Sequence, residues 1–429
     1  MKRLGDLHSS VCTANNVEIA DDNARKCKPK NWGVRKHDKH REEDNAKLLN
    51  DLTNLTNKTS EYSTFKIYEP KERLIFRLPY FPDRIAHHAI MNVMEPIWVK
   101  SFIHHTYSCI KGRGIHRLAV DIKKVLRNDN TGTQYCLKLD VKKFYPSIDH
   151  EVLKFEILRR KIKDKKLLAL LDEIVDSTDG VPIGNYLSQF FANLTLTYFD
   201  HWIFEEVKPE LMKRGIKLYY FRYADDIVVL SNDKEALREI LTLIKTYFHQ
   251  VVKLELKGNY QIFPVDSRGI DFVGYRFYHT HTLLRKSIKH RIFKLVNKYK
   301  ANKISLEEFK RKMSSYFGRL KYCDSKHLLQ KIEQETGLHY SNWEGIESNI
   351  SLFYGKDIRI VEVVPYSKYF RINFVYKKKS YTVKSKSTKL YHELSNKSFP
   401  LNYKLKSYAR TKKSRIECNP TEVCGPWEW

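Results

Sequence analysis

Three aspartates stand where a β-strand usually avoids them. The segment "YYFRYADDIVVL" (219–230) places Asp225 and Asp226 inside a run of aromatic and β-branched residues, and the strand-like segment "YCLKLDV" (135–141) carries Asp140. Asp is a poor strand former, and an unpaired buried charge is unfavourable. A plain hairpin turn is the alternative explanation, because Asp favours turns. The apolar residues on both sides of the pair argue against an ordinary solvent-exposed loop.

The spacing of these carboxylates predicts a metal site. Side chains alternate along a strand, so Asp225 and Asp226 share a direction only if a tight turn lies at or beside them. We therefore expect two strands that meet at the aspartates, with the turn facing Asp140. Such a cluster is repulsive without cations, and its oxygens suit Mg²⁺. Two ions about 3.5–4 Å apart would support in-line phosphoryl displacement; we expect Mg²⁺, with Mn²⁺ able to substitute.

The charge of the chain indicates a polyanionic partner. Its 429 residues include 78 Lys and Arg against 50 Asp and Glu, a formal net charge of +28, and residues 281–429 contribute +19 of it from 32 basic and 13 acidic residues. A concentrated positive field favours nucleic acid over a merely solvated basic surface. The seven cysteines show no zinc-type spacing and predict reduced thiols. No stretch approaches the roughly 18 apolar residues of a membrane span, so we expect a cytoplasmic protein with no membrane partner.

The hydrophobic pattern predicts an α+β protein. Residues 1–60 are polar and are expected to be helical or loosely ordered. A hairpin is expected near 65–78, followed by a helix with Asp83 as its N-cap. Residues 283–337 read as a basic helical segment. The region 345–410 is β-rich and rich in Tyr and Lys, a composition suited to single-stranded RNA.

Several motifs together resemble those of reverse transcriptases. "RYADDIVVL" resembles the [YF]xDD signature, "LKLDVKKFYPSIDH" the preceding aspartate motif, "GVPIGNYLSQFFANL" the glycine–serine motif and "FVGY" the primer grip. Their order matches, and the resemblance spans about 65–335. It implies a right-hand polymerase with an additional C-terminal β-rich domain. The expected parts are an N-terminal extension (1–60), fingers and palm (61–282), a helical thumb (283–337) and a basic, RNA-binding domain (338–429).

The resemblance also implies roles for individual residues. The three aspartates would be catalytic, and metal binding falls to Asp140, Val141, Asp225 and Asp226. Tyr145 matches the aromatic position beneath the sugar, where its ring would clash with a 2′-OH. Ordinary core packing of Tyr145, or confusion with the neighbouring Phe144, is the alternative.

Nucleotide binding and the primer grip fall to further segments. The residues expected at the incoming nucleotide are Lys71, Arg73, Arg77, Tyr145, Gly184, Ser188, Gln189 and Lys257. The basic residues near 71–77 would grip the triphosphate, Lys257 would assist the pyrophosphate, and Gly184 would let the backbone approach base or sugar. A solvated strand face and helix capping are the alternatives. The primer grip would comprise Phe272, Val273, Gly274 and Tyr275.

The glycine–serine motif narrows the resemblance further. Most reverse transcriptases carry Gln before the glycine and Pro after the serine, whereas here Ile183 and Gln189 occupy those positions. This version resembles the enzymes of diversity-generating retroelements, which copy a template RNA with errors at adenines. Ile183 and Gln189 would then loosen base selection. An antiphage-defence reverse transcriptase and a non-catalytic RNA-binding protein with a relic palm are the alternatives. The expected partners are an RNA template, a DNA or RNA primer, dNTPs, a cognate non-coding RNA and an accessory protein.

Overall fold

The structure is a computed structural model with two units. It describes residues 3–26, 31–68, 72–338, 357–365, 370–376, 379–385, 394, 397–398 and 401–404. The boundary between the units lies between Arg285 and Lys286. Within the described ranges, no helix is both long enough and apolar enough to cross a membrane.

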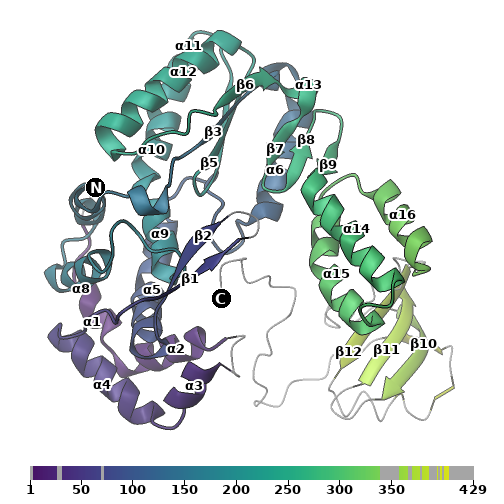
Figure 1. Ribbon diagram of the computed structural model, residues 1–429, viewed down its shortest axis with the longest axis horizontal. Helices are drawn as coiled ribbons and strands as arrows, with labels where there is room; N and C mark the ends of the chain where they lie inside the picture. The colour runs from purple at the N-terminus through teal and green to yellow at the C-terminus, as the bar shows by residue number, and fades with distance from the viewer. Residues whose placement is uncertain are drawn as a thin grey trace. The chain divides into compact units, whose positions relative to one another are not determined.

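The N-terminal residues form helices that belong to the core of the first unit. These helices are α1 (Leu7–Val11), α2 (Ala14–Ala24), α3 (Trp32–His37) and α4 (Arg41–Asn54). Helix α2 lies against helix α5 (Ile85–Val99), where Asn16 Nδ2 donates to the Ala89 carbonyl at 2.9 Å. Val17 and Leu48 are buried in the same hydrophobic core. Figure 1 shows α2, α3 and α4 gathered at one end of this unit, so the helical alternative of the prediction is the one found.

The predicted hairpin and the helix after it are both present. Strands β1 (Ser63–Ile67) and β2 (Arg73–Arg77) pair antiparallel, with Ser63 opposite Arg77. A π-helical segment, η1 (Tyr80–Arg84), then leads into α5. The N-cap of α5 is Arg84, so the prediction of Asp83 as N-cap is wrong. The buried Asp83 carboxylate instead accepts a hydrogen bond from the Ser60 backbone N–H at 2.9 Å, which ties the preceding segment to the helix start.

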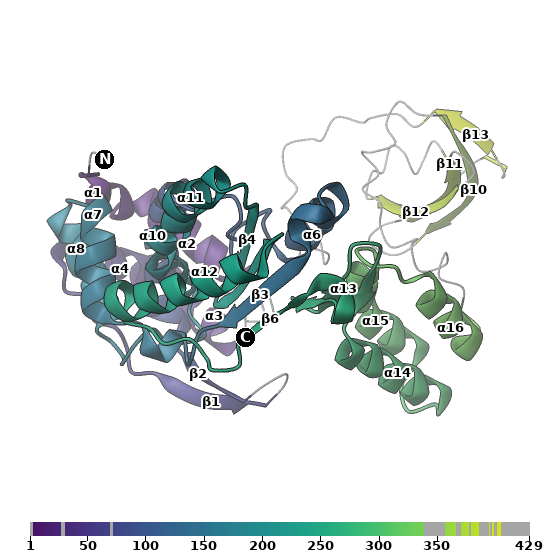
Figure 2. The ribbon, with the colours of Figure 1, turned by 90° about the horizontal axis from the view of Figure 1, so that it is seen from above.

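A four-stranded antiparallel sheet forms the centre of the first unit. Its strand order is β4 (Leu218–Tyr223), β5 (Asp226–Ser231), β3 (Tyr135–Asp140) and β6 (Gln261–Pro264). Helix α12 (Lys234–Tyr247) lies along this sheet (Figure 2) and begins at Asp233, whose carboxylate accepts from two backbone N–H groups of the first turn. Leu237, Ile240 and Ile244 are buried at helical spacing, so the sheet and helix share one apolar face.

The remaining elements of this unit surround the sheet. The α-helices are α6 (Ile115–Asn128), α7 (Arg159–Lys161), α8 (Lys165–Val175), α9 (Tyr186–Thr195), α10 (Thr197–Trp202), α11 (Lys208–Lys213) and α13 (Val265–Arg268). The 3₁₀ and π segments are η2 (Thr131–Thr133), η3 (Tyr145–Ser147), η4 (Val152–Leu158), η5 (Ile203–Val207) and η6 (Phe248–Val252). A second, antiparallel sheet contains β7 (Ile270–Phe272), β8 (Tyr275–Phe277) and β9 (Thr282–Leu284).

The second unit contains basic helices and an antiparallel sheet. Its helices are α14 (Lys286–Lys300), α15 (Leu306–Leu320) and α16 (Lys326–Thr336). Its strands are β10 (Asp357–Pro365), β11 (Phe370–Tyr376), β12 (Lys379–Ser385) and β13 (Leu401–Lys404), in the order β12-β11-β10-β13. Figure 2 shows this sheet strongly curved. The described strands agree with the β-rich character predicted for this region.

Candidate active site

The hairpin β4–β5 brings the three aspartates together. Asp226 opens β5 and is the Cα partner of Asp140 at the end of β3. Tyr223 pairs with Asp226 across the hairpin, so Ala224 and Asp225 form a two-residue turn between the strands. The predicted hairpin is therefore confirmed, and its tip lies beside the end of β3. Backbone pairing alone thus places two carboxylates side by side and a third on the adjoining turn.

The turn that carries Asp225 has an uncommon backbone conformation. Ala224 has φ = 52°, in the left-handed region that residues with a Cβ rarely adopt. A positive φ at the first central residue, Ala224, but not at the second, Asp225, is typical of a type II′ turn. The twist of this turn matches that of the flanking strands. Glycine usually occupies this position, so alanine stores strain in the turn.

Burial and like charges together disfavour ionisation in the cluster. Burial, followed by the charges of Asp226 and Asp140, raises the pKa of Asp225 to about 7. Burial also raises the pKa of Asp226, opposed by the nearby Lys138. The charge of Asp140 adds to the rise at both residues, so like charges contribute to the cost of ionising Asp225 and Asp226.

The oxygens of Asp140 have different surroundings. Its Oδ2 accepts a hydrogen bond from Lys257 Nζ, whereas its Oδ1 is buried and has no hydrogen-bond partner among the described residues. The Lys257 backbone N–H also donates to the Asp140 carbonyl at 2.8 Å. Lys257 therefore lies directly at the carboxylate cluster, although its role toward pyrophosphate stays a prediction.

The donor set fits a hard divalent cation, although no preformed metal cage is present. In the part of the chain that the structure describes, no three His, Cys, Asp or Glu side chains are arranged as a metal site. A cation would nevertheless satisfy the buried Asp140 oxygen that has no partner among the described residues, beside the Asp225 carboxyl whose pKa is raised by burial and by like charges. Val141 is buried and could offer only its backbone carbonyl.

The predicted triphosphate residues lie on or near β2. Arg73 is partly buried and Arg77 is exposed, whereas Lys71 lies outside the described residues. The pKa of Tyr145 is raised mainly by burial; the charge of Asp225 adds to this rise and the charge of Arg73 opposes it. Arg73 on β2 and Asp225 on the turn therefore both interact electrostatically with Tyr145. Their role toward phosphate stays a prediction.

The glycine–serine motif packs against the same strand. The Ile183 carbonyl accepts from the Phe76 backbone N–H at 2.8 Å. Gly184 has φ = 128°, and a Cβ built there would lie 2.4 Å from the Phe76 carbonyl oxygen. The close approach visible at Gly184 is therefore to β2, and an approach to base or sugar stays a prediction. In the following helix α9, Ser188 is buried and Gln189 is partly exposed.

Phe144 and Tyr145 differ in burial, and the role of Tyr145 beneath the sugar stays a prediction. Phe144 is 3% exposed and belongs to the hydrophobic core. Tyr145 is partly exposed, and burial, aided by the charges of Cys109 and Asp225, raises its pKa. The Val181 backbone N–H donates to the Tyr145 carbonyl at 2.9 Å, which anchors this segment to the loop before α9.

The predicted primer grip is a tight hairpin. Val273 and Gly274 form the turn between β7 and β8 with φ values of 43° and 93°, as in a type I′ turn. Phe272 and Tyr275 pair across it and are both fully buried. Of the four residues, Val273 is partly exposed, whereas Gly274 is buried like its aromatic neighbours, and their role toward a primer stays a prediction.

Sequence reasoning missed the residues that connect this hairpin to the carboxylates. Lys138 Nζ donates to the Asp271 carbonyl at 2.7 Å, and Arg285 Nε donates to Asp271 Oδ1 at 2.6 Å. The pKa of Asp226 is raised overall by burial, and both cations oppose that rise because they favour the ionised carboxylate. Lys138 stands two residues before Asp140 on one strand, and this period-two spacing could have revealed it.

Comparison with known proteins identifies the class. The family model described as "Reverse transcriptase (RNA-dependent DNA polymerase)" matches residues 66–277, which include β2, the aspartate hairpin and β7–β8. This chain therefore carries a reverse transcriptase domain and is an RNA-directed DNA polymerase.

Individual relatives share this part of the chain. The chain is 23% identical to Protein YkfC of Escherichia coli strain K12, over 54% of this chain and 69% of that protein. It is 27% identical to the Retron Ec73 reverse transcriptase of Escherichia coli, over 57% of this chain and 77% of that protein. A solved apo telomerase from Candida tropicalis is 13% identical with a TM-score of 0.36, over 52% of this chain and 48% of that one.

Proposed function

We propose that the chain polymerises DNA on an RNA template by two-metal nucleotidyl transfer at Asp140, Asp225 and Asp226. The observation that carries this proposal is the register of β3 and β5, which pairs Asp140 with Asp226 and sets Asp225 on the turn beside them. Burial, with added repulsion from Asp140, raises the pKa values of Asp225 and Asp226, and a bound cation would favour the ionised carboxylates. A relic palm would have no electrostatic reason to keep this arrangement.

Each carboxylate has a defined part in this proposal. Asp140 and Asp225 would hold two Mg²⁺ ions, or Mn²⁺ in their place, with Asp226 and the Val141 carbonyl as further ligands. When bound, the ions would stabilise the attacking and leaving oxygens of the phosphoryl displacement. Lys257, which donates a hydrogen bond to Asp140, would neutralise charge on the departing pyrophosphate.

The incoming nucleotide would lie between β2 and the aspartate hairpin. Arg73 and Arg77 would contact its triphosphate, because guanidinium groups suit phosphate oxygens. Tyr145 would lie under the sugar and exclude a 2′-OH. Tyr145 packs against the hydrophobic core but stays partly exposed, which is compatible with this placement.

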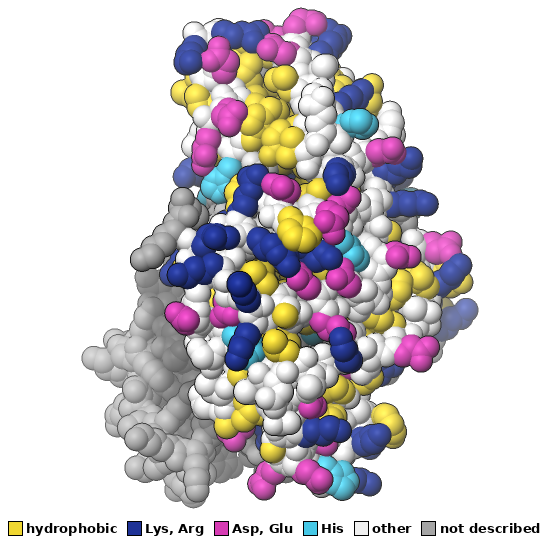
Figure 3. Space-filling view, turned by 90° about the vertical axis from the view of Figure 1, so that its left-hand side faces the viewer, with side chains coloured by type: hydrophobic (Ala, Val, Ile, Leu, Met, Phe, Trp, Pro, Cys, Tyr) yellow, Lys and Arg dark blue, Asp and Glu magenta, His cyan; other side chains and the backbone are white. Residues whose placement is uncertain are grey.

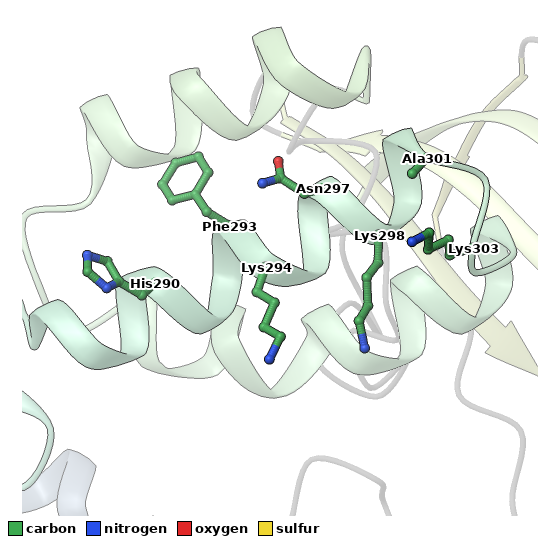
Figure 4. A pocket seen from close by; sticks show the side chains of 7 residues that line it. All are labelled: His290, Phe293, Lys294, Asn297, Lys298, Ala301 and Lys303. Carbon is green, nitrogen blue, oxygen red and sulfur yellow. The ribbon is translucent and has the colours of Figure 1, made fainter.

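The second unit would hold the nucleic acid. Helix α14 carries a pocket of about 680 Å³ lined by His290, Phe293, Lys294, Asn297, Lys298, Ala301 and Lys303. Figure 4 shows the side chains of Lys294 and Lys298 extended on the same side of this helix. In the first unit, by contrast, Arg159 pairs with Asp172, and Figure 3 shows basic and acidic side chains interspersed over one face. The unbalanced positive charge of residues 281–429 thus favours the second unit for backbone phosphates.

The template is proposed to be one specific structured RNA. Similarity to a protein named Retron Ec73 reverse transcriptase, over 77% of its length, favours cDNA synthesis from a cognate non-coding RNA, as in the defence alternative. Copying with errors at adenines, as in diversity-generating retroelements, rests on Ile183 and Gln189 alone. Sequencing the RNA that co-purifies with the chain and the cDNA it makes separates these cases. An error spectrum unchanged by Ile183→Gln with Gln189→Pro would remove the fidelity role.

The catalytic proposal is tested by Asp225→Asn combined with Asp226→Asn. We expect this variant to lose Mg²⁺-dependent dNTP incorporation on a primed RNA while it binds that RNA as the wild type does. The matched control is Glu205→Gln with Glu206→Gln, which neutralises an adjacent, exposed acidic pair and should leave incorporation unchanged. If the aspartate double variant incorporated dNTPs at the wild-type rate, the proposal would be refuted.

A further inference from the structure

A buried arginine stands immediately behind the aspartate turn. Arg222 lies on β4, two residues before Ala224, and its side chain is 0% exposed. Removing a guanidinium from water is unfavourable unless its donors are paired with good geometry. The position therefore requires partners that satisfy the whole planar group.

Helix α10 supplies the main partner, Asp200, which is also 0% exposed. Arg222 Nε donates to Asp200 Oδ1 at 2.8 Å, and Arg222 Nη2 donates to Oδ2 at 2.5 Å, so the pair is bidentate. The hydroxyls of Tyr220 and Thr106 donate to the same carboxylate at 2.6 and 3.1 Å. Asp200 is thereby fixed from three sides.

The other edge of the guanidinium reaches the turn itself. Arg222 Nη1 donates to the Ala224 carbonyl at 3.0 Å and to Asn193 Oδ1 at 3.2 Å. Asn193 belongs to α9 and is held in place because its Nδ2 donates to the Ser108 carbonyl at 2.8 Å. The Ala224 carbonyl is part of the peptide bond that leads into Asp225, and its donor is thus anchored to two helices.

This contact opposes a local backbone preference. Ala224 has φ = 52°, a conformation that persists only where the surroundings fix it. A buried ion pair is poor evidence for stability, because an apolar pair of similar volume often stabilises as well. A guanidinium fork fixes direction, however, which an apolar side chain cannot do.

We propose that Arg222, anchored by Asp200, is a positioning residue that fixes the peptide between Ala224 and Asp225 and so aims the Asp225 carboxylate toward Asp140. This inference rests on the proposed catalytic role of Asp225. It assigns to a buried pair behind the turn control over the geometry of the chemical step.

The test is Arg222→Lys, which keeps the charge beside Asp200 but lacks the planar fork that reaches Asp200 and Ala224 together. We expect kcat for dNTP incorporation to fall about 10- to 100-fold, as for small displacements of a reacting group. KM for dNTP and RNA binding should stay within about twofold of the wild type, because uniform binding is untouched. Asp200→Asn is the second variant and should lower kcat in the same direction, so the test does not depend on one protein folding well.

The matched control is Arg25→Lys, which weakens another arginine pair with a 0% exposed carboxylate, Asp21, in helix α2. All variants are assayed well below their melting temperatures. Arg25→Lys should lose thermal stability yet keep wild-type kcat, whereas Arg222→Lys should lose kcat while folded.

Wild-type kcat in folded Arg222→Lys and Asp200→Asn, beside an inactive Asp225→Asn/Asp226→Asn protein, would overturn this inference alone. Equal loss of kcat in Arg25→Lys would also overturn it, because the effect would then be one of general stability. Activity in the double aspartate variant would overturn the proposed function and this inference with it.

Discussion

Replacing Asp225 by Asn should stabilise the metal-free protein while it removes activity. The carboxyl of Asp225 has an ordinary pKa of 3.8, which burial and the charges of Asp226 and Asp140 raise to about 7 in the folded chain. The folded state therefore holds this proton more tightly than the unfolded chain does. The stabilisation from the proton is complete below about pH 4 and is lost as the pH rises through about 7. Above that pH the folded protein carries uncompensated repulsion.

The size of the effect follows from the difference in pKa. Since one pKa unit corresponds to 1.36 kcal/mol, the rise in the pKa of Asp225 from 3.8 to about 7 amounts to about 4 kcal/mol as an upper limit. The charge is shared among three carboxylates and the site is partly open to water, which reduces the figure to about 2 kcal/mol. For a chain of this size we expect a rise in melting temperature of about 3–6 °C in the Asn variant at pH 8.

Thermal unfolding in EDTA between pH 4 and pH 8 measures this directly. The melting temperature of the wild type should fall, relative to that of Asp225→Asn, as the pH rises, and the two proteins should converge near pH 4. Addition of Mg²⁺ at pH 8 should raise the melting temperature of the wild type and have much less effect on the variant. Glu205→Gln, at an exposed acid, controls for the loss of one charge. An Asn variant that melts at or below the wild type at pH 8 in EDTA would refute the reasoning.

Two further perturbations probe how the site is supported. Gly184→Ala places a Cβ against the Phe76 carbonyl at a φ of 128°. This variant should destabilise the protein by about 1–3 kcal/mol and raise KM for dNTP. The control, Gly318→Ala in helix α15, has open space around the new Cβ and should instead stabilise the protein by about 0.5–1 kcal/mol. Asp21→Asn removes a buried charge that accepts from Tyr80, Arg25 and Arg41, and should cost about 3 kcal/mol in urea unfolding at pH 7. Burial acts to raise the pKa of Asp21, but hydrogen bonds from His37, Tyr80 and Arg25 hold it well below its usual range. The difference from wild type should therefore be full above about pH 4, shrink below it and disappear only near the lowered pKa of the folded state; a difference that does not shrink below about pH 4 would contradict this account.

Local rules recovered the elements that carry the aspartates. Alternation of apolar residues and the incompatibility of adjacent carboxylates with a strand were enough to predict the β4–β5 hairpin and its turn. The cap of α12 at Asp233 also follows from a short-range signal, because the capping carboxylate and its donors are neighbours in sequence. Asp83 failed as a predicted cap because its partner, the Ser60 backbone, lies 23 residues earlier in the chain.

Long-range pairing hid the rest of the site. Arg222 meets Asp200, and Lys138 meets the carbonyl of Asp271, across separations that no periodic pattern encodes. The glycine at 184 was predicted to face a nucleotide, whereas the contact that the structure shows is with the backbone of Phe76. Such contacts depend on tertiary packing, which a single sequence does not specify.

The three aspartates and their supports follow opposite physical rules. At the turn, like charges are crowded together, one Asp140 oxygen has no partner in the described residues, and Ala224 adopts an unfavourable φ. Behind the turn, each donor of the buried Arg222 is directed at Asp200, Asn193 or the Ala224 carbonyl. A turn under repulsion would relax outward if its neighbours were soft, because backbone strain persists only where the surroundings fix it. We therefore propose that the paired groups behind the turn keep the carboxylates at its tip close to Asp140, as the proposed shared cation requires.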